Sequence, residues 1–356
     1  MNIKARFPQI DAIKGLAIVS VLLLHTLPET FLIDSYSVFY IWQAMPIFLI
    51  AIGLTWYHSF RNSGSSLLRE LYSRKYLKRR LSRILVPFIM IVAIDLAITI
   101  ATNRLSQSVA FTIVKAMIGS LHPELPGLWF IPLLLELIFI APLLYYLFRR
   151  SPVIALVVTF VIDLGFELCG TYLPLNVYNS SILRYIAALG IGFYIAPELL
   201  TKGKLNLMDR RFLFIVPLAA LSAVLLVIYN GASFSFFQPE WRTQNLFTFF
   251  YPALLVILIF NLYSPVSKTI FHTILELTGR ASYHIFLIQM LYFGYLYSGF
   301  DIHTNGIMSP YVYWPILIIS TLVVNIMLGI VLYKIEGVLR EKLNRMRLGN
   351  GTRTPV

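Results

Sequence analysis

The sequence has few charged residues and only one cysteine. Asp, Glu, Lys and Arg make up 13% of its 356 residues, whereas 58% of the residues are hydrophobic and the mean hydropathy is +0.77. Such a chain is too apolar to be a soluble globule, and its composition is typical of a protein that crosses a membrane several times. The single cysteine, Cys169, excludes an intramolecular disulfide framework.

The sequence also lacks the short motifs of the common nucleotide-dependent and metal-dependent enzymes. It contains no P-loop and no GxGxxG segment, and its six histidines are scattered without the HExxH spacing of a zinc site. The loops expected inside the cell are short apart from residues 60–83, so we expect no soluble domain between the apolar segments. These absences predict a protein without a bound metal or cofactor, whose functional site lies among the membrane segments.

Ten apolar runs are long enough to cross a bilayer, and they are bounded by charges or by Pro, Gly and Asn. They predict an all-α polytopic membrane protein with about ten transmembrane helices, at residues 9–27, 38–59, 84–101, 128–148, 152–169, 182–198, 212–230, 246–263, 281–299 and 312–333. We expect residues 1–340 to form a single transmembrane domain and residues 341–356 to form a basic, disordered cytoplasmic tail.

The distribution of positive charge gives this topology a direction. If the N-terminus is cytoplasmic, all but four of the 29 Lys and Arg residues fall in inner segments, the four being Arg104, Lys115, Arg184 and Arg242. The positive-inside rule therefore predicts that both termini are cytoplasmic. It also accounts for the net charge of +13 without a nucleic-acid partner.

Two ionisable residues share one face of the first predicted helix. Lys14 and His25 are eleven residues apart, which is close to three helical turns or about 16 Å along the axis. The face would run from the inner edge of the membrane at Lys14 to about its middle at His25. An ionisable side chain at that depth is costly unless it faces protein or water, so His25 is a candidate functional residue.

A basic segment precedes the third predicted helix, and Arg80 and Arg83 lie on one face of it. Two interpretations remain open from this segment alone. The arginines could bind lipid headgroups and fix the topology, or they could form a phosphate clamp, because the guanidinium fork fits phosphate oxygens.

Several segments together resemble the acyltransferase 3 family of integral membrane O-acyltransferases. Residues 10–17 followed by His25 fit the family's signature of a basic residue, ten further residues and a histidine. Arg80-Leu81-Ser82-Arg83 followed by Pro87 fits its RxxR motif. Weaker matches occur in the family's order at residues 45–53, 128–130, 190–194, 279–283 and 333–336.

The resemblance implies an acyl-CoA donor, usually acetyl-CoA, and a hydroxyl acceptor, commonly a lipid-linked or nascent glycan of the bacterial cell envelope. It implies a stand-alone acyltransferase domain in the bacterial plasma membrane, without a C-terminal esterase-like domain. Lys14, Arg80 and Arg83 would bind the donor, and His25 would act as general base or carry the acyl group covalently. Gln289 departs from the family, where relatives often carry histidine.

Three acids fall near the expected depth of His25 and are candidates to orient its ring, namely Asp95, Glu136 and Asp163. We prefer Glu136, because it lies two turns from Trp129 in a family-like segment. For Asp163 the more economical interpretation is a bond to another polar residue across the helices. At the inner rim, Asp11 is expected to pair with Lys14 or with an arginine.

Trp129, Ser282 and Tyr283 lie near span starts, where they either contact substrate or serve as interface and helix-packing residues. Two alternatives to glycan acylation stay open. The same chemistry could act on a lipid or a small metabolite, or the chain could be a transporter whose midplane histidine and acids relay protons.

Overall fold

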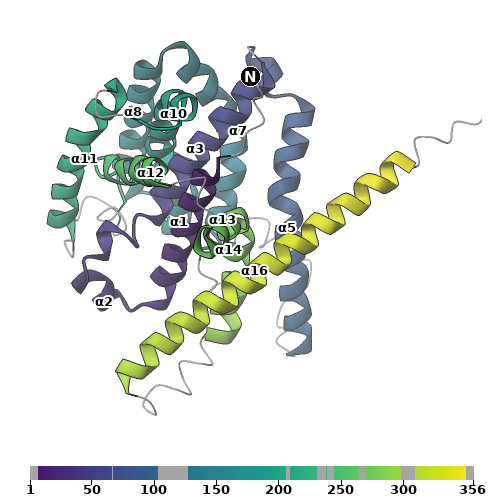
Figure 1. The fold of residues 1–356 in the computed structure, drawn as a ribbon. Helices are drawn as coiled ribbons and strands as arrows, with labels where there is room; N and C mark the ends of the chain where they lie inside the picture. Colours follow the sequence, from purple (N-terminus) through teal and green to yellow (C-terminus); the bar gives the residue numbers. More distant parts are fainter. Residues whose placement is uncertain are drawn as a thin grey trace, which may run out of the picture.

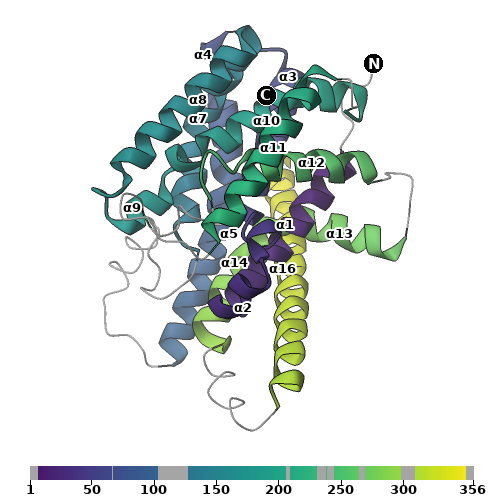
Figure 2. The ribbon, with the colours of Figure 1, turned by 90° about the vertical axis from the view of Figure 1, so that its left-hand side faces the viewer.

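A computed structural model describes residues 7–65, 67–102, 127–205, 209–230, 238, 244–263, 269–297 and 309–349. All regular structure in these residues is helical (Figures 1 and 2). The elements are α1 (Pro8–Thr26), α2 (Glu29–Asp34), η1 (Ser37–Phe39), α3 (Ala44–Ser63), α4 (Leu68–Leu71), α5 (Arg74–Ala101), α7 (Phe130–Arg150), α8 (Pro152–Gly170), α9 (Leu175–Ser180), η2 (Ile182–Tyr185), α10 (Ile186–Lys202), α11 (Arg210–Tyr229), α12 (Phe250–Leu262), α13 (Ile270–Arg280), α14 (Ser282–Leu291), the π-helical η4 (Tyr292–Tyr297) and α16 (Pro310–Gly349).

The prediction of an all-α polytopic membrane protein is confirmed. Within the described ranges, eight helices are long and apolar enough to cross a membrane. The two remaining predicted spans, 246–263 and 281–299, coincide with shorter helices. These are α12 with 13 residues, and α14 with 10 residues extended by the 6 residues of η4.

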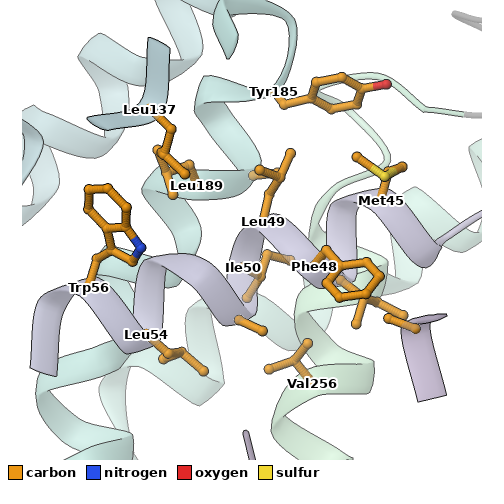
Figure 3. Packing of buried hydrophobic residues seen from close by; sticks show 14 of the residues in the cluster. Met45, Phe48, Leu49, Ile50, Leu54, Trp56, Leu137, Tyr185, Leu189 and Val256 are labelled. Atoms are coloured by element: carbon orange, nitrogen blue, oxygen red, sulfur yellow. The ribbon is translucent and has the colours of Figure 1, made fainter. Parts of the chain in front are cut away.

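Helix α3 lies in the centre of the bundle and packs most extensively against α10. Figure 3 shows its apolar side chains, among them Leu49 and Ile50, directed toward Leu189 of α10 and Val256 of α12. Glycine permits the close approach of the two backbones, because a Cβ added at Gly53 would lie 2.7 Å from the carbonyl oxygen of Leu189.

A second group of helices, α1, α5, α13, α14 and α16, packs beside this core (Figures 1 and 2). Helices α1 and α13 approach closely where a Cβ at Gly279 would overlap the carbonyl oxygen of Asp11. The long α16 crosses α14 and also contacts α1 and α5. The candidate active site lies among these helices and α3.

Helix α16 corrects the prediction of a disordered tail in part. It continues to Gly349, so residues 341–349 are helical, while residues 350–356 lie outside the described part of the chain. Ion pairs one turn apart stabilise this extension, because Arg340 pairs with Glu336 and Arg345 with Glu341.

Candidate active site

A cavity of about 990 Å³ opens where the inner ends of α1, α3, α5, α13, α14 and α16 meet. Its wall carries six cationic side chains and only two carboxylates. These are Lys14, Arg79, Arg83, Arg280, Lys334 and Arg340 against Asp11 and Glu336. The excess of positive charge favours an anionic ligand in this cavity.

Three of these cations make no direct polar contact within the described part of the chain. Arg79, Arg83 and Lys334 are exposed to the cavity and make no hydrogen bond or ion pair with the described residues. Arg79 and Arg83 are four residues apart on α5, so both project from the same helix face. Their charges are available to a ligand such as a phosphate group.

Lys14 and Asp11 are held at the rim by neighbouring helices. The Lys14 ammonium donates a hydrogen bond to the Thr55 hydroxyl of α3 at 3.2 Å. Asp11 pairs with Arg280, whose Nε lies 3.6 Å from the carboxylate and whose Nη2 lies 3.2 Å from Glu276. The expectation that Asp11 pairs with an inner-rim cation is therefore met by Arg280.

A buried polar network joins α14, α16 and α5 at the cavity wall. His284 Nε2 lies 2.8 Å from the carboxylate of Glu336, which also pairs with Arg340. Arg340 in turn donates hydrogen bonds to the hydroxyl and the carbonyl oxygen of Ser82, at 3.1 and 2.7 Å. These bonds fix the wall of the cavity opposite Lys14.

Arg80 does not take the place that the sequence predicted for it. Its guanidinium lies 4.2 Å from the ring centroid of Trp56 and donates a 2.9 Å hydrogen bond to Ser59, both on α3. Arg79, rather than Arg80, lines the cavity together with Arg83. The aromatic surface of α3 holds Arg80 by a cation–π contact, which turns it away from the cavity.

A smaller chamber of about 160 Å³ adjoins the cavity, since Lys14, Ser282 and Tyr283 line both. Its remaining wall is apolar and comes from Ile18, Val21, Met45, Phe48, Ile52, Phe130, Leu134 and Phe286. Lys14, Ile18 and Val21 follow one another on a single face of α1. His25 is the next residue on that face, one turn beyond Val21.

His25 lies at the outer end of this face. Its ring is partly exposed, and its centroid lies 5.6 Å from that of Phe293 in η4. None of the described residues hydrogen-bonds to the imidazole. Beside it, the Tyr297 hydroxyl donates to the carbonyl oxygen of Thr26 at 3.1 Å, so η4 is attached to the end of α1.

The preferred partner of His25, Glu136, is engaged elsewhere. Its carboxylate accepts hydrogen bonds from the Ile182 backbone N–H at 2.8 Å and from the Ser181 hydroxyl at 3.3 Å. The first N–H groups of a helix have no intrahelical acceptor, so a carboxylate is stabilised at this position. Glu136 therefore caps η2 and does not orient His25.

The other two candidate acids are buried and also bind side chains or backbone groups. Asp95 accepts a 2.6 Å hydrogen bond from Tyr295, two residues after the ring that contacts His25. Asp163 accepts from the backbone N–H of Ala187 at 3.1 Å. The hydrogen bond from Tyr295 of η4 thus links Asp95 to the surroundings of His25. Asp163 binds the backbone of α10 and not, as expected, a polar side chain of another helix.

Trp129, Ser282 and Tyr283 have different environments. Trp129 stacks on Tyr185, with ring centroids 6.2 Å apart, at the start of α7. Tyr283 lines both cavities and donates a hydrogen bond to the carbonyl oxygen of Ile84 at 3.0 Å, which joins α14 to α5. Ser282 lines both cavities, whereas Trp129 is not in their walls.

Four cationic side chains of the cavity wall were not predicted as site residues, namely Arg79, Arg280, Lys334 and Arg340. Two signals pointed to them. Arg79 precedes Arg83 by four residues, and Lys334 lies in the family-like segment 333–336. The contribution of α16 to an inner cavity depends on how the last helix crosses the first, which a single sequence does not encode locally.

Comparison with known proteins supports one assignment. A protein-family model described as "Acyltransferase domain" matches residues 7–330, which extend from the start of α1 into α16. Searches of curated proteins and of solved structures found no match. The match covers most of the chain and includes the helices that carry Lys14, His25, Arg79 and Arg83. The chain therefore belongs to the acyltransferase 3 family and is a multi-pass membrane acyltransferase.

Proposed function

We propose that the protein is an O-acyltransferase of the bacterial plasma membrane, which moves an acetyl group from cytoplasmic acetyl-CoA to a hydroxyl of a cell-envelope glycan or glycolipid. The observation that carries this proposal is the continuity of the site. A cationic cavity at the inner rim adjoins an apolar chamber along the face of α1 that leads to His25.

The inner cavity suits the charged end of the donor. Coenzyme A carries its phosphates at the nucleotide end, and Arg79, Arg83 and Lys334 offer unpaired cations there. Guanidinium groups bind phosphate oxygens through two parallel hydrogen bonds. Lys14 lies at the junction with the chamber, where the flexible arm of the donor would enter.

The chamber suits the uncharged arm and the acyl group. Apart from Lys14, Ser282 and Tyr283, its wall is formed by aliphatic and aromatic side chains, including Phe48, Phe130 and Phe286. An apolar wall with a few polar groups orients a ligand and excludes water from a reactive thioester. The arm would bring the thioester about 16 Å into the membrane, from Lys14 toward His25.

In the proposed reaction, the neutral imidazole of His25 takes the proton from the acceptor hydroxyl. The oxygen attacks the thioester carbonyl, the C–S bond breaks, and the thiolate of coenzyme A takes up a proton on leaving. General base catalysis contributes roughly 10² to 10⁴ in rate. Transfer through an acyl-imidazole on His25 would use the same geometry in two steps. His25 is half-buried, which is compatible with either route.

The proposal is tested with the purified protein in lipid nanodiscs, given acetyl-CoA and a lipid-linked glycan extract. Release of coenzyme A and a mass increase of one acetyl group per glycan are the expected results. The variant Arg74→Ala should keep this activity, because Arg74 begins α5 but does not line the cavity, so it serves as a control for the loss of one positive charge. Failure to bind acetyl-CoA would refute its assignment as the donor. Acetylation of a lipid extract in place of the glycan would refute the assignment of a glycan as the acceptor.

A further inference from the structure

Gln289 is a buried polar residue of α14, the helix that also carries Ser282 and Phe286 of the chamber wall. Its side chain is fully buried in α14, yet neither its amide oxygen nor its amide nitrogen has a hydrogen-bond partner among the described residues. A buried amide without partners costs about 1–3 kcal/mol. Such a group is explained if a ligand supplies the missing partners.

The position of Gln289 agrees with this explanation. Ser282, Phe286, Gln289 and Phe293 follow one another on one face of α14 and η4. Ser282 and Phe286 line the chamber, and Phe293 contacts His25 at the far end. Gln289 therefore lies between the chamber and His25.

The backbone of Gly127 packs next to this amide. Gly127 has a positive φ of 90°, and a Cβ there would lie 3.1 Å from the Phe286 ring and 3.7 Å from Nε2 of Gln289. Glycine thus keeps side-chain atoms away from the two residues at the end of the chamber.

We propose that Gln289 binds a secondary amide of the pantetheine arm of the donor, an inference that rests on the proposed function. A carboxamide has one acceptor oxygen and donor hydrogens on its nitrogen. A secondary amide is its complement, because it presents one N–H and one C=O. A thioester carbonyl could pair with Nε2 only, and would leave Oε1 of Gln289 unpaired.

The test compares three ligands of the full-length protein in nanodiscs by calorimetry. Coenzyme A carries the arm without a thioester, acetyl-CoA carries both, and adenosine 3′,5′-bisphosphate carries phosphates without the arm. Gln289→Met keeps the shape of the side chain but removes the donor and the strong acceptor. Asn325→Leu is the control, because it removes a buried amide from α16 whose nitrogen already donates to the Thr321 carbonyl oxygen.

Gln289→Met is expected to weaken coenzyme A and acetyl-CoA alike by about tenfold, since the arm amide is left unpaired. Affinity for the bisphosphate stays unchanged, and Asn325→Leu changes none of the three. The melting temperature of Gln289→Met stays the same or rises, because an unpaired buried amide has been removed.

Three results would overturn the inference. If Gln289→Met binds coenzyme A with unchanged affinity but acetyl-CoA more weakly, Gln289 contacts the thioester carbonyl and not the arm amide. A melting temperature lowered by several degrees, with all three ligands weakened, would make Gln289 a structural residue. If Gln289→Met binds all three ligands as tightly as the unchanged protein does, Gln289 does not contact the donor. If the unchanged protein binds no coenzyme A, the proposed function itself fails.

Discussion

Replacing Arg83 by alanine removes one of the cations of the inner cavity and should weaken binding of the donor. A hydrogen bond to a charged group is worth about 1.5–3 kcal/mol when it is shielded from water, whereas an exposed ion pair contributes about 0.2–1 kcal/mol. Arg83 is exposed at the cavity wall. We therefore expect a loss of about 1.4 kcal/mol, which is a tenfold rise in Kd.

The double variant Arg79→Ala/Arg83→Ala should lose more affinity than the product of the two single effects. The two residues lie one turn apart on α5 and face the same ligand charge, so one can partly replace the other. Kd is measured by calorimetry for acetyl-CoA and for adenosine 3′,5′-bisphosphate at two salt concentrations. Both ligands should weaken together, and the salt dependence should decrease in the double variant.

Arg74→Ala on the same helix is the control for this series, and its Kd should not change. The reasoning is refuted if Arg83→Ala leaves the Kd of both ligands unchanged. It is also refuted if Arg74→Ala weakens them as much, because the effect would then come from overall charge.

Two further predictions concern packing. Gly279→Ala should lower the melting temperature by several degrees, because its Cβ would overlap the carbonyl oxygen of Asp11 and overpacking costs about 1–3 kcal/mol; Gly165→Ala has open space around its Cβ and should leave the melting temperature equal or higher. Arg80→Ala should reduce stability by about 1 kcal/mol through loss of its contact with Trp56, and its acetyl-CoA affinity should change less than that of Arg83→Ala. A larger affinity loss in Arg80→Ala than in Arg83→Ala would contradict the arrangement of the cavity.

The features that could be predicted from the sequence are those that depend on local patterns. Hydropathy over about twenty residues located the membrane helices, and the helical period placed Lys14 and His25 on one face of α1. In the structure, Lys14 on this face lines both cavities, and Ile18 and Val21 line the chamber. Both inferences use residues within one helix, so no knowledge of the tertiary fold was required.

The partners of individual polar residues could not be predicted in this way. Whether Arg79 or Arg80 enters the cavity depends on Trp56 of α3, which holds Arg80. Glu136 binds the start of η2, which is formed 45 residues later in the chain at Ser181. The partner of each of these side chains lies on a helix that is distant in the sequence. The depth of a residue in the membrane alone does not determine its partner.

His25, at the end of the α1 face, is the residue proposed to perform the acyl transfer. This role is tested most directly by single-turnover transfer of labelled acetyl from acetyl-CoA to the glycan extract, with Kd measured on the same preparations. We expect His25→Ala to bind acetyl-CoA with unchanged Kd and to transfer acetyl at least about 10²-fold more slowly. Transfer at the rate of the unchanged protein in His25→Ala would contradict this role.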